Sequence, residues 1–281
     1  MKQATVVGSG VMGKGIAYAF AIAGFKVYVS DIKEDILQKA KTDIENLMEG
    51  GYKKGFLKES IYQQAKENLQ YDTDLETAAK DSDIVVEAVL EKIDLKVQVF
   101  QQLDKICKPE AILATNTSTM SPTEIGAQTN RSDNVVAMHF FNPVHKMKLI
   151  EVIRGLDTSD ETVSKVMNVS EQMNKEAVEV NEFPGFVTSR MNCLIGNEAM
   201  NMLMEGVASA MDIDKAMKLG LNHPMGPLEL ADLVGLDSRL RNIEYLHETL
   251  GEKYRPSPIL TKYVKAGRLG KKSGSGFYNY S

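Results

Sequence analysis

Residues 3–13, Gln-Ala-Thr-Val-Val-Gly-Ser-Gly-Val-Met-Gly, decide how the chain folds, because a short apolar run leads directly into three regularly spaced glycines. The run over 3–7 predicts a buried strand, and the apolar pattern over 15–23 predicts a helix that ends at Gly24. A second strand is predicted over 25–31. These pieces form a strand–helix–strand unit, and its crossover requires the two strands to be parallel.

The glycines Gly8, Gly10 and Gly13 fit the pattern G-x-G-x-x-G of dinucleotide-binding turns. In this pattern the first glycine permits a tight turn, the second lets the backbone approach a pyrophosphate, and the third lets the helix pack close to the strand. The pattern alone is a weak indicator, but here it follows a strand, opens a helix and precedes an acidic residue, Asp31, at the end of the next strand. We therefore predict a dinucleotide site rather than a purely structural turn.

The same turn and the acidic residue indicate which dinucleotide binds. Val11 and Met12 lie in the turn, where a helix N-terminus offers free N–H groups to phosphates. Asp31 can accept hydrogen bonds from ribose hydroxyls but would repel a 2′-phosphate, so the sequence favours NAD over NADP. Lys33 is two residues on and could offset such a phosphate, although a solvated lysine at a helix start is the simpler interpretation.

Composition excludes several other classes of protein. The chain has 281 residues, of which 43% are hydrophobic and 25% charged, and its formal net charge is −5, so we expect no binding to nucleic acid or to an anionic membrane. No apolar stretch is long enough for a membrane span or a signal peptide. Two cysteines, in separate predicted helices, make a disulfide framework implausible. We expect a soluble protein in a reducing, cytoplasmic compartment.

The remaining pattern predicts an α/β domain followed by a helical one. Residues 33–69 are helical and charged, and we expect Gly50–Gly51 to break them into an inserted helical hairpin. Strands and helices alternate up to residue 184, and only helices are predicted after it. The predicted strands are 83–88, 111–115, 134–141, 148–153 and 177–180, and the predicted helices are 93–107, 121–128, 160–174, 185–205, 212–219, 226–234 and 236–250. We expect domains at 1–184 and 185–281.

His139 ends an apolar strand, at the sheet edge where open α/β proteins bind their ligands. A lone histidine there is more often structural. Glu151, however, interrupts the next apolar strand, and if the two strands pair antiparallel about His145, residues 139 and 151 lie opposite each other. A carboxylate facing an imidazole fixes its orientation and raises its basicity, as a general base requires.

With these segments in place, the chain resembles the L-3-hydroxyacyl-CoA dehydrogenase family over essentially its whole length, and by its length the short 3-hydroxybutyryl-CoA type. The matching segments are 8–13, 85–91, 116–119, 139–143, 148–153, 184–187, 223–227 and 270–278. The resemblance implies a Rossmann-type N-terminal domain, a helical C-terminal domain for substrate and dimerisation, and a homodimer. It also implies that His139, held by Glu151, is the catalytic acid/base, and that Ser118 hydrogen-bonds the substrate oxygen.

By the same resemblance, five further residues contact the cofactor beside Ser118: Glu91, Lys96, Asn116, Asn142 and Lys272. Lys54 resembles a residue that meets the CoA moiety, although a lysine on a helix is usually just solvated. Ser118 is alternatively a turn or N-cap residue. No histidine or cysteine set has the spacing of metal ligands, so no metal is predicted. The clustered methionines, such as Met191 and Met204, are interpreted as core or subunit-interface packing.

The chain departs from the family pattern at Ser189, where most relatives carry a catalytic asparagine. The shorter serine still offers a hydroxyl, Asn192 on the same helix face is an alternative donor, and Ser189 can also be a mere helix-start residue. The leading hypothesis is an NAD-dependent 3-hydroxyacyl-CoA dehydrogenase. The alternatives are a dehydrogenase of free hydroxy acids, of the gulonate or carnitine type, and a non-catalytic NAD-binding protein, against which His139, Glu151 and Ser118 argue.

Overall fold

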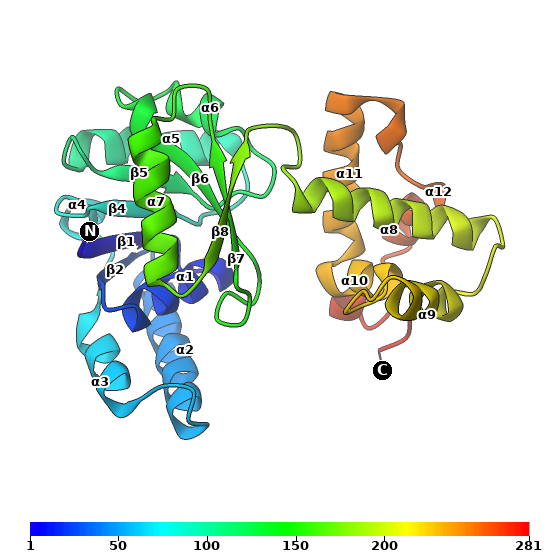
Figure 1. Ribbon diagram of the computed structural model, residues 1–281, viewed down its shortest axis with the longest axis horizontal. Coiled ribbons are helices and arrows are strands. Elements are labelled where there is room, and N and C mark those ends of the chain that lie inside the picture. The colour runs from blue at the N-terminus through cyan, green and yellow to red at the C-terminus, as the bar shows by residue number, and fades with distance from the viewer. Residues whose placement is uncertain (281) are drawn as a thin grey trace. The chain divides into compact units, whose positions relative to one another are not determined.

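The computed structural model describes residues 1–280, which form two compact units (Figure 1). The first unit is Met1–Glu182 and the second begins at Phe183. The first is an α/β unit and the second is almost entirely helical, so the predicted fold class is confirmed. No helix among residues 1–280 combines the length and apolar character needed to span a bilayer.

The first unit is built on one eight-stranded sheet with the order β3-β2-β1-β4-β5-β6-β7-β8. Neighbouring strands are parallel except for β6 and β7, which pair antiparallel. The strand order reverses between β1 and β4, the place where open sheets of this kind bind ligands. The strands are β1 (Gln3–Val7), β2 (Lys26–Ser30), β3 (Leu69–Asp72), β4 (Ile84–Glu87), β5 (Ile112–Thr115), β6 (Val135–Phe140), β7 (Leu149–Arg154) and β8 (Glu176–Asn181).

Helices cover both faces of this sheet. Consecutive residues of a strand therefore enter different cores: Ile84 and Val86 pack in one cluster and Val85 in the other. Burial on both faces explains why the strands are continuous apolar runs rather than alternating ones. One core is completed by α1 (Val11–Ile22), α2 (Glu34–Lys53), α3 (Glu59–Asn68) and α7 (Asp160–Gln172), and the other by α4 (Leu75–Ala79), α5 (Ile93–Ile106) and α6 (Pro122–Gly126).

The inserted hairpin is present, but the predicted break at Gly50–Gly51 is wrong. Helix α2 continues through both glycines to Lys53, and the chain turns at Gly55, where φ is +75°. Gly51 instead packs against Leu57, whose side chain would lie 3.2 Å from a Cβ at Gly51. Its carbonyl also accepts hydrogen bonds from the N–H groups of Phe56 and Leu57, which closes the turn. Gly51 therefore serves close packing inside the helix, whereas a Cβ at Gly50 would meet no atom within 4 Å.

The helical unit has a core of its own. Its helices are α8 (Thr188–Met204), α9 (Ala210–Gly220), α10 (Pro227–Val234), α11 (Leu236–Leu250) and α12 (Pro258–Lys265). Met200, Leu228 and Ile243 lie at the centre, and Leu260 joins them from α12, a helix that the sequence reasoning missed. Met191 and Met204, at the two ends of α8, are about half exposed. The methionines thus divide between core and surface.

Two buried aspartates hold the helical unit together. Asp214 accepts hydrogen bonds from the N–H groups of Leu228 and Glu229, at 2.9 Å each, and so caps α10 from outside that helix. Asp232 accepts from the N–H groups of Phe277 and Tyr278, at 3.0 and 2.9 Å. The hydroxyl of Tyr278 donates to Asp214 at 2.7 Å, which joins the two clusters. The segment after α12 is therefore fixed to α9 and α10.

Candidate active site

The glycine turn between β1 and α1 fits a dinucleotide pyrophosphate. Gly8 has φ +94°, and a Cβ there would lie 2.8 Å from the backbone of Ala88, while a Cβ at Gly13 would overlap the carbonyl oxygen of Gly8. A Cβ at Gly10 would meet no atom within 4 Å, so the fold leaves open space beside that residue. Helix α1 also has no side-chain cap and no acidic residue in its first turn. Its first N–H groups, at Val11 and beyond, can therefore bind an anion.

Asp31 follows β2 and is tied to the glycine turn. Its Oδ2 accepts hydrogen bonds from both the N–H and the hydroxyl of Ser9, at 2.8 Å each, and its Oδ1 accepts from the N–H of Ile32 at 2.8 Å. Ser9 is buried, and the sequence reasoning gave it no role. The carboxylate keeps accepting capacity on Oδ1 and is partly exposed, as contact with a ribose hydroxyl requires.

His139 and Glu151 face each other across β6 and β7, and the predicted antiparallel pairing of the two residues is confirmed. Nδ1 of His139 lies 2.7 Å from Oε2 of Glu151, which is completely buried, while His139 is 8% exposed. Because the carboxylate accepts, Nδ1 carries a proton, so Nε2 is the ring nitrogen that could exchange a proton with a ligand. The pair can take up and return a proton at the ligand-binding edge of the sheet.

The loop after β5 is held to the strands on both sides. The N–H of Asn116 donates to the carbonyl of Glu87 on β4, and Oδ1 of Asn116 accepts from the N–H of Phe140 on β6 at 3.0 Å. The N–H of Ser118 donates to Oε1 of Glu91 at 3.0 Å. Within residues 1–280 the Ser118 hydroxyl has no hydrogen-bond partner, so it can donate to a ligand oxygen.

Three charged residues form a cluster at the end of β4. Nζ of Lys96 lies 2.7 Å from Oε1 of Glu87 and 3.1 Å from Oε2 of Glu91. The side chains of Lys96 and Glu87 are completely buried, and that of Glu91 is 40% exposed. The hydroxyl of Thr117 donates to Glu91 as well. The family resemblance pointed to Glu91 and Lys96, whereas no role was predicted for Glu87 or Thr117, whose side-chain partners Lys96 and Glu91 lie 9 and 26 residues away.

The other predicted site residues lie at the surface. Asn142 follows β6 and is exposed, and so is Lys54, which ends α2. In the helical unit, Nζ of Lys272 lies 2.5 Å from Oδ1 of Asp237. The structure thus brings Ser118, Glu91 and Lys96 into direct contact, and His139 with Glu151. Among residues 1–280, Asn142 and Lys54 form no hydrogen bond or ion pair with either group, Lys272 belongs to the second unit, and the ligand contacts of all three stay predictions.

Ser189 lies in the first turn of α8, and Asn192 lies one turn further on; both are half-buried. The helix is preceded by two residues with positive φ, Gly185 at +77° and Phe186 at +50°. Its N-cap is Val187, which makes no side-chain capping bond, so Ser189 is not the cap of this helix. A packing role or a ligand-facing role remains for its hydroxyl.

Comparison with known proteins places this site in one family. The family pattern described as "3-hydroxyacyl-CoA dehydrogenase, NAD binding domain" matches residues 3–183, and the pattern for the C-terminal domain of the same family matches residues 185–280. A probable 3-hydroxybutyryl-CoA dehydrogenase of Bacillus subtilis (strain 168) is 49% identical over 281 residues, which cover 100% of this chain and 98% of the relative.

More distant relatives agree. The mitochondrial hydroxyacyl-coenzyme A dehydrogenase of Homo sapiens is 39% identical and covers 100% of this chain and 91% of its own length. The crystal structure of (S)-3-hydroxybutyryl-CoA dehydrogenase PaaH1 from Ralstonia eutropha superposes with a TM-score of 0.96 at 42% identity, covering 100% of this chain and 99% of that one. With the glycine turn and the His139–Glu151 pair already in place, the chain therefore belongs to the 3-hydroxyacyl-CoA dehydrogenase family.

Proposed function

We propose that this protein is an NAD-dependent oxidoreductase that interconverts (S)-3-hydroxyacyl-CoA, with 3-hydroxybutyryl-CoA as the first candidate, and 3-ketoacyl-CoA in fatty acid or butanoate metabolism. The observation that carries the proposal is the buried His139–Glu151 pair, at 2.7 Å, on the sheet whose first turn fits a dinucleotide. Relatives named 3-hydroxybutyryl-CoA dehydrogenase match over the full length, which supports this substrate.

The chemistry at the reacting carbon needs one base and one hydrogen-bond donor. When bound, NAD would supply the hydride acceptor for C3, and NADH would supply the hydride donor for the reverse reaction. Nε2 of His139 accepts the proton of the 3-hydroxyl, and the carboxylate of Glu151 stabilises the resulting imidazolium. The hydroxyl of Ser118 donates to the same substrate oxygen and stabilises its partial negative charge. Ser189 has a supporting role near that oxygen.

The remaining site residues bind the two ligands. Asp31 selects NAD by accepting from the adenosine ribose, beside the phosphate site at Gly8, Gly10, Val11, Met12 and Gly13. Glu91, Lys96, Asn116, Asn142 and Lys272 complete the cofactor site. Lys54, an exposed cation at the end of α2, binds a phosphate of CoA. The cofactor domain is residues 1–184, and residues 185–281 form the substrate and dimerisation domain.

A parallel assay tests the substrate. Oxidation of NADH is followed with acetoacetyl-CoA, free acetoacetate and dehydrogulonate at equal concentrations. We expect turnover with acetoacetyl-CoA and little with the free acids. Turnover of a free acid alone would identify a hydroxy-acid dehydrogenase of the same fold, and no turnover together with NADH binding would identify a non-catalytic NAD-binding protein.

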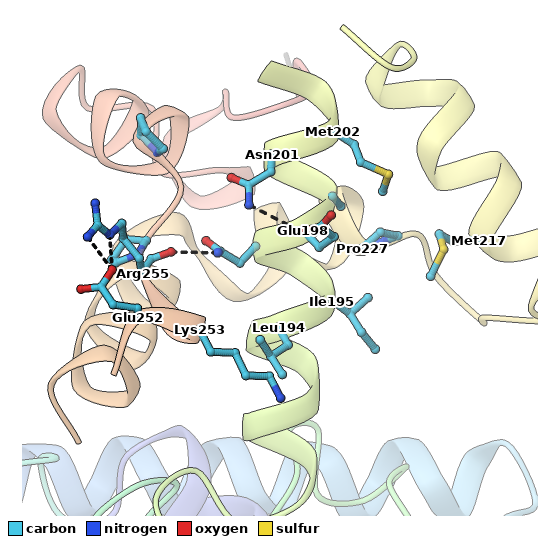
Figure 2. A pocket seen from close by; sticks show the side chains of 14 residues that line it. Leu194, Ile195, Glu198, Asn201, Met202, Met217, Pro227, Glu252, Lys253 and Arg255 are labelled. Atoms are coloured by element: carbon cyan, nitrogen blue, oxygen red, sulfur yellow. Dashed lines mark hydrogen bonds and ion pairs between the residues drawn. The ribbon is translucent and has the colours of Figure 1, made fainter. Parts of the chain in front are cut away.

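The homodimer is proposed to form through the helical unit. A hollow of about 670 Å³ lies along one side of α8, and Figure 2 shows Leu194, Ile195 and Met202 facing it, with Met217 across from them. Glu198 and Arg255 lie among the residues that line it. Large apolar side chains are exposed elsewhere on the same unit, at Met191, Val207, Met211, Leu219 and Leu221. An apolar area with a few charges is what a second copy would cover.

Sedimentation velocity tests the dimer. We expect the wild type to sediment as a dimer and Ile195→Glu as a monomer, because a buried unpaired carboxylate opposes association. Leu156→Glu is the matched control, since Leu156 is 82% exposed and belongs to the first unit. A wild type that stays monomeric at all concentrations would overturn this part of the proposal.

A further inference from the structure

Glu87 is a fully buried carboxylate at the ligand-binding edge of the sheet, and the chemistry proposed above does not use it. Both of its oxygens contact Nζ of Lys96, at 2.7 and 3.0 Å. Oε1 also accepts from the N–H of Val89 at 2.7 Å, and Oε2 accepts from the hydroxyl of Thr115 at 2.7 Å. Glu87 therefore joins β4, β5 and α5 at one point.

Lys96 links Glu87 to a second carboxylate, that of Glu91. An ammonium group has three N–H donors, and Nζ of Lys96 contacts three carboxylate oxygens, two of Glu87 and one of Glu91. Its side chain is completely buried. In this arrangement the donors of Lys96 face carboxylate oxygens, so Lys96 fixes the position of Glu91.

Glu91 in turn contacts the loop after β5, which carries Thr117 and Ser118. While its Oε2 contacts Lys96, its Oε1 accepts from the N–H of Ser118 and from the hydroxyl of Thr117. Two carboxylates share one ammonium, so the cluster carries a net negative charge, and the exposed member is Glu91. A partly exposed carboxylate with this surplus charge accepts hydrogen bonds from hydroxyl groups of a ligand.

The position of the cluster in the sheet indicates which part of the dinucleotide Glu91 contacts. A dinucleotide spans the point where the strand order reverses, here between β1 and β4. Asp31, after β2, takes the adenosine ribose on one side of that point. The Glu87 cluster lies after β4 and β5, on the other side, where the nicotinamide half belongs.

We propose that Glu87 is a positioning residue for the nicotinamide half of the cofactor. Glu87 fixes the ammonium of Lys96, Lys96 fixes Glu91, and Glu91 holds both the nicotinamide ribose and the backbone of Ser118. The proposal rests on the proposed function, because it takes the ligand to be NAD. A purely structural ion pair would stabilise the fold equally well but would not distinguish one half of the cofactor from the other.

Two probes separate these roles: NADH, which has both halves, and ADP, which lacks both the nicotinamide and its ribose. The variant is Glu87→Gln, which keeps the shape of the side chain but removes its charge and replaces one of its two accepting oxygens by an NH2 group. We expect the dissociation constant of NADH to rise about tenfold, as for loss of a charge-assisted interaction, and that of ADP to change by less than about twofold. Equal weakening of both ligands, or no change in either, overturns the proposal.

The matched control is Asp104→Asn, which removes the charge from another buried carboxylate of the same unit. Asp104 pairs with Arg131 at 2.8 Å, its side chain is 6% exposed, and it lies near the C-terminal end of α5, away from the strand ends. We expect Asp104→Asn to lower the melting temperature without changing the ratio of the two dissociation constants.

A double variant covers the case in which Glu87→Gln does not fold. Glu87→Gln with Lys96→Met removes both buried charges, which is far less destabilising than removing one partner. Glu91 loses its anchor in this protein too, so we expect the same selective loss of NADH affinity, and an unchanged ratio would overturn the proposal. Failure of the wild type to bind NADH at all would instead overturn the proposed function.

Discussion

Buried carboxylates differ between the two units of this protein. In the first unit, Glu87 and Glu151 face a lysine and a histidine at the ligand-binding edge of the sheet. In the helical unit, Asp214 and Asp232 accept hydrogen bonds from backbone N–H groups and tyrosine hydroxyls, and within residues 1–280 neither forms an ion pair. Of these four carboxylates, we assign the two that face a lysine or a histidine at the ligand-binding edge to ligand binding and chemistry, and the two that collect amide N–H groups to architecture.

The largest effect is expected at the chemical pair. His139→Ala removes the base, so kcat should fall by roughly 10²–10⁴, the range for general acid–base catalysis, while NADH affinity stays nearly unchanged. Steady-state kinetics and a fluorescence titration with NADH measure the two quantities. His247→Ala, which removes a surface histidine paired with Glu252 in the helical unit, is the control. Activity of His139→Ala within a few-fold of wild type would refute the mechanism.

On the architectural side, Asp232→Ala should lower the free energy of unfolding by about 3 kcal/mol, because it leaves the N–H groups of Phe277 and Tyr278 and the hydroxyl of Tyr280 without their acceptor. Urea unfolding followed by circular dichroism measures this. Asp212→Ala, at an exposed position of α9, should cost much less. If the unfolding midpoint of Asp232→Ala were unchanged but its activity lost, Asp232 would have a role in the active site and not in stability.

Ser189 tests whether the helical unit takes part in the chemistry at all. Ser189→Ala should lower kcat/KM by an amount worth about 1–2 kcal/mol, the range for losing one neutral hydrogen bond. Asn192→Ala is the companion variant, one turn along the same helix. A silent Ser189→Ala together with a crippled Asn192→Ala would show that the asparagine carries the role. If neither variant changed kcat/KM, the chemistry would depend on residues of the first unit alone.

The smallest effect concerns pH. Burial raises the pKa of Asp232 above its ordinary value, although the N–H groups of Tyr278 and Phe277 act in the opposite direction. The folded state therefore keeps this proton at a pH where the unfolded chain has lost it, so the contribution of Asp232 to stability falls as pH rises from about 4. Asp232→Asn should flatten the decline of the melting temperature over this range. If the melting temperature of Asp232→Asn fell with pH as steeply as that of the wild type, groups other than Asp232 would cause the fall.

Local pattern was enough to predict the elements that carry the site. The turn after β1 was found because glycine spacing, strand and helix all lie within residues 3–22. The His139–Glu151 contact was found because the antiparallel connection between β6 and β7 is short enough for residue numbers alone to set the register.

Distant partners could not be predicted in the same way. Glu87 lies in an apolar strand, and its contacts come from Lys96 on a helix and Thr115 on another strand, so no periodicity marks it. Strand β3 is four residues long and lies at the sheet edge, and α12 is eight residues long beside a glycine-rich tail. Such elements are formed by what they pack against rather than by their own sequence.

The attachment of residues 277–280 to Asp214 and Asp232 has a consequence during protein synthesis. The sheet has all eight of its strands once residue 181 has left the ribosome. Asp214 receives the N–H groups of Leu228 and Glu229 early, but the tyrosine donors of Asp214 and Asp232 are missing until Tyr278 and Tyr280 have emerged. Tyr278 is translated 64 residues after Asp214, and Tyr280 is translated 48 residues after Asp232. The first unit can fold while translation continues, and the helical unit completes its core only afterwards.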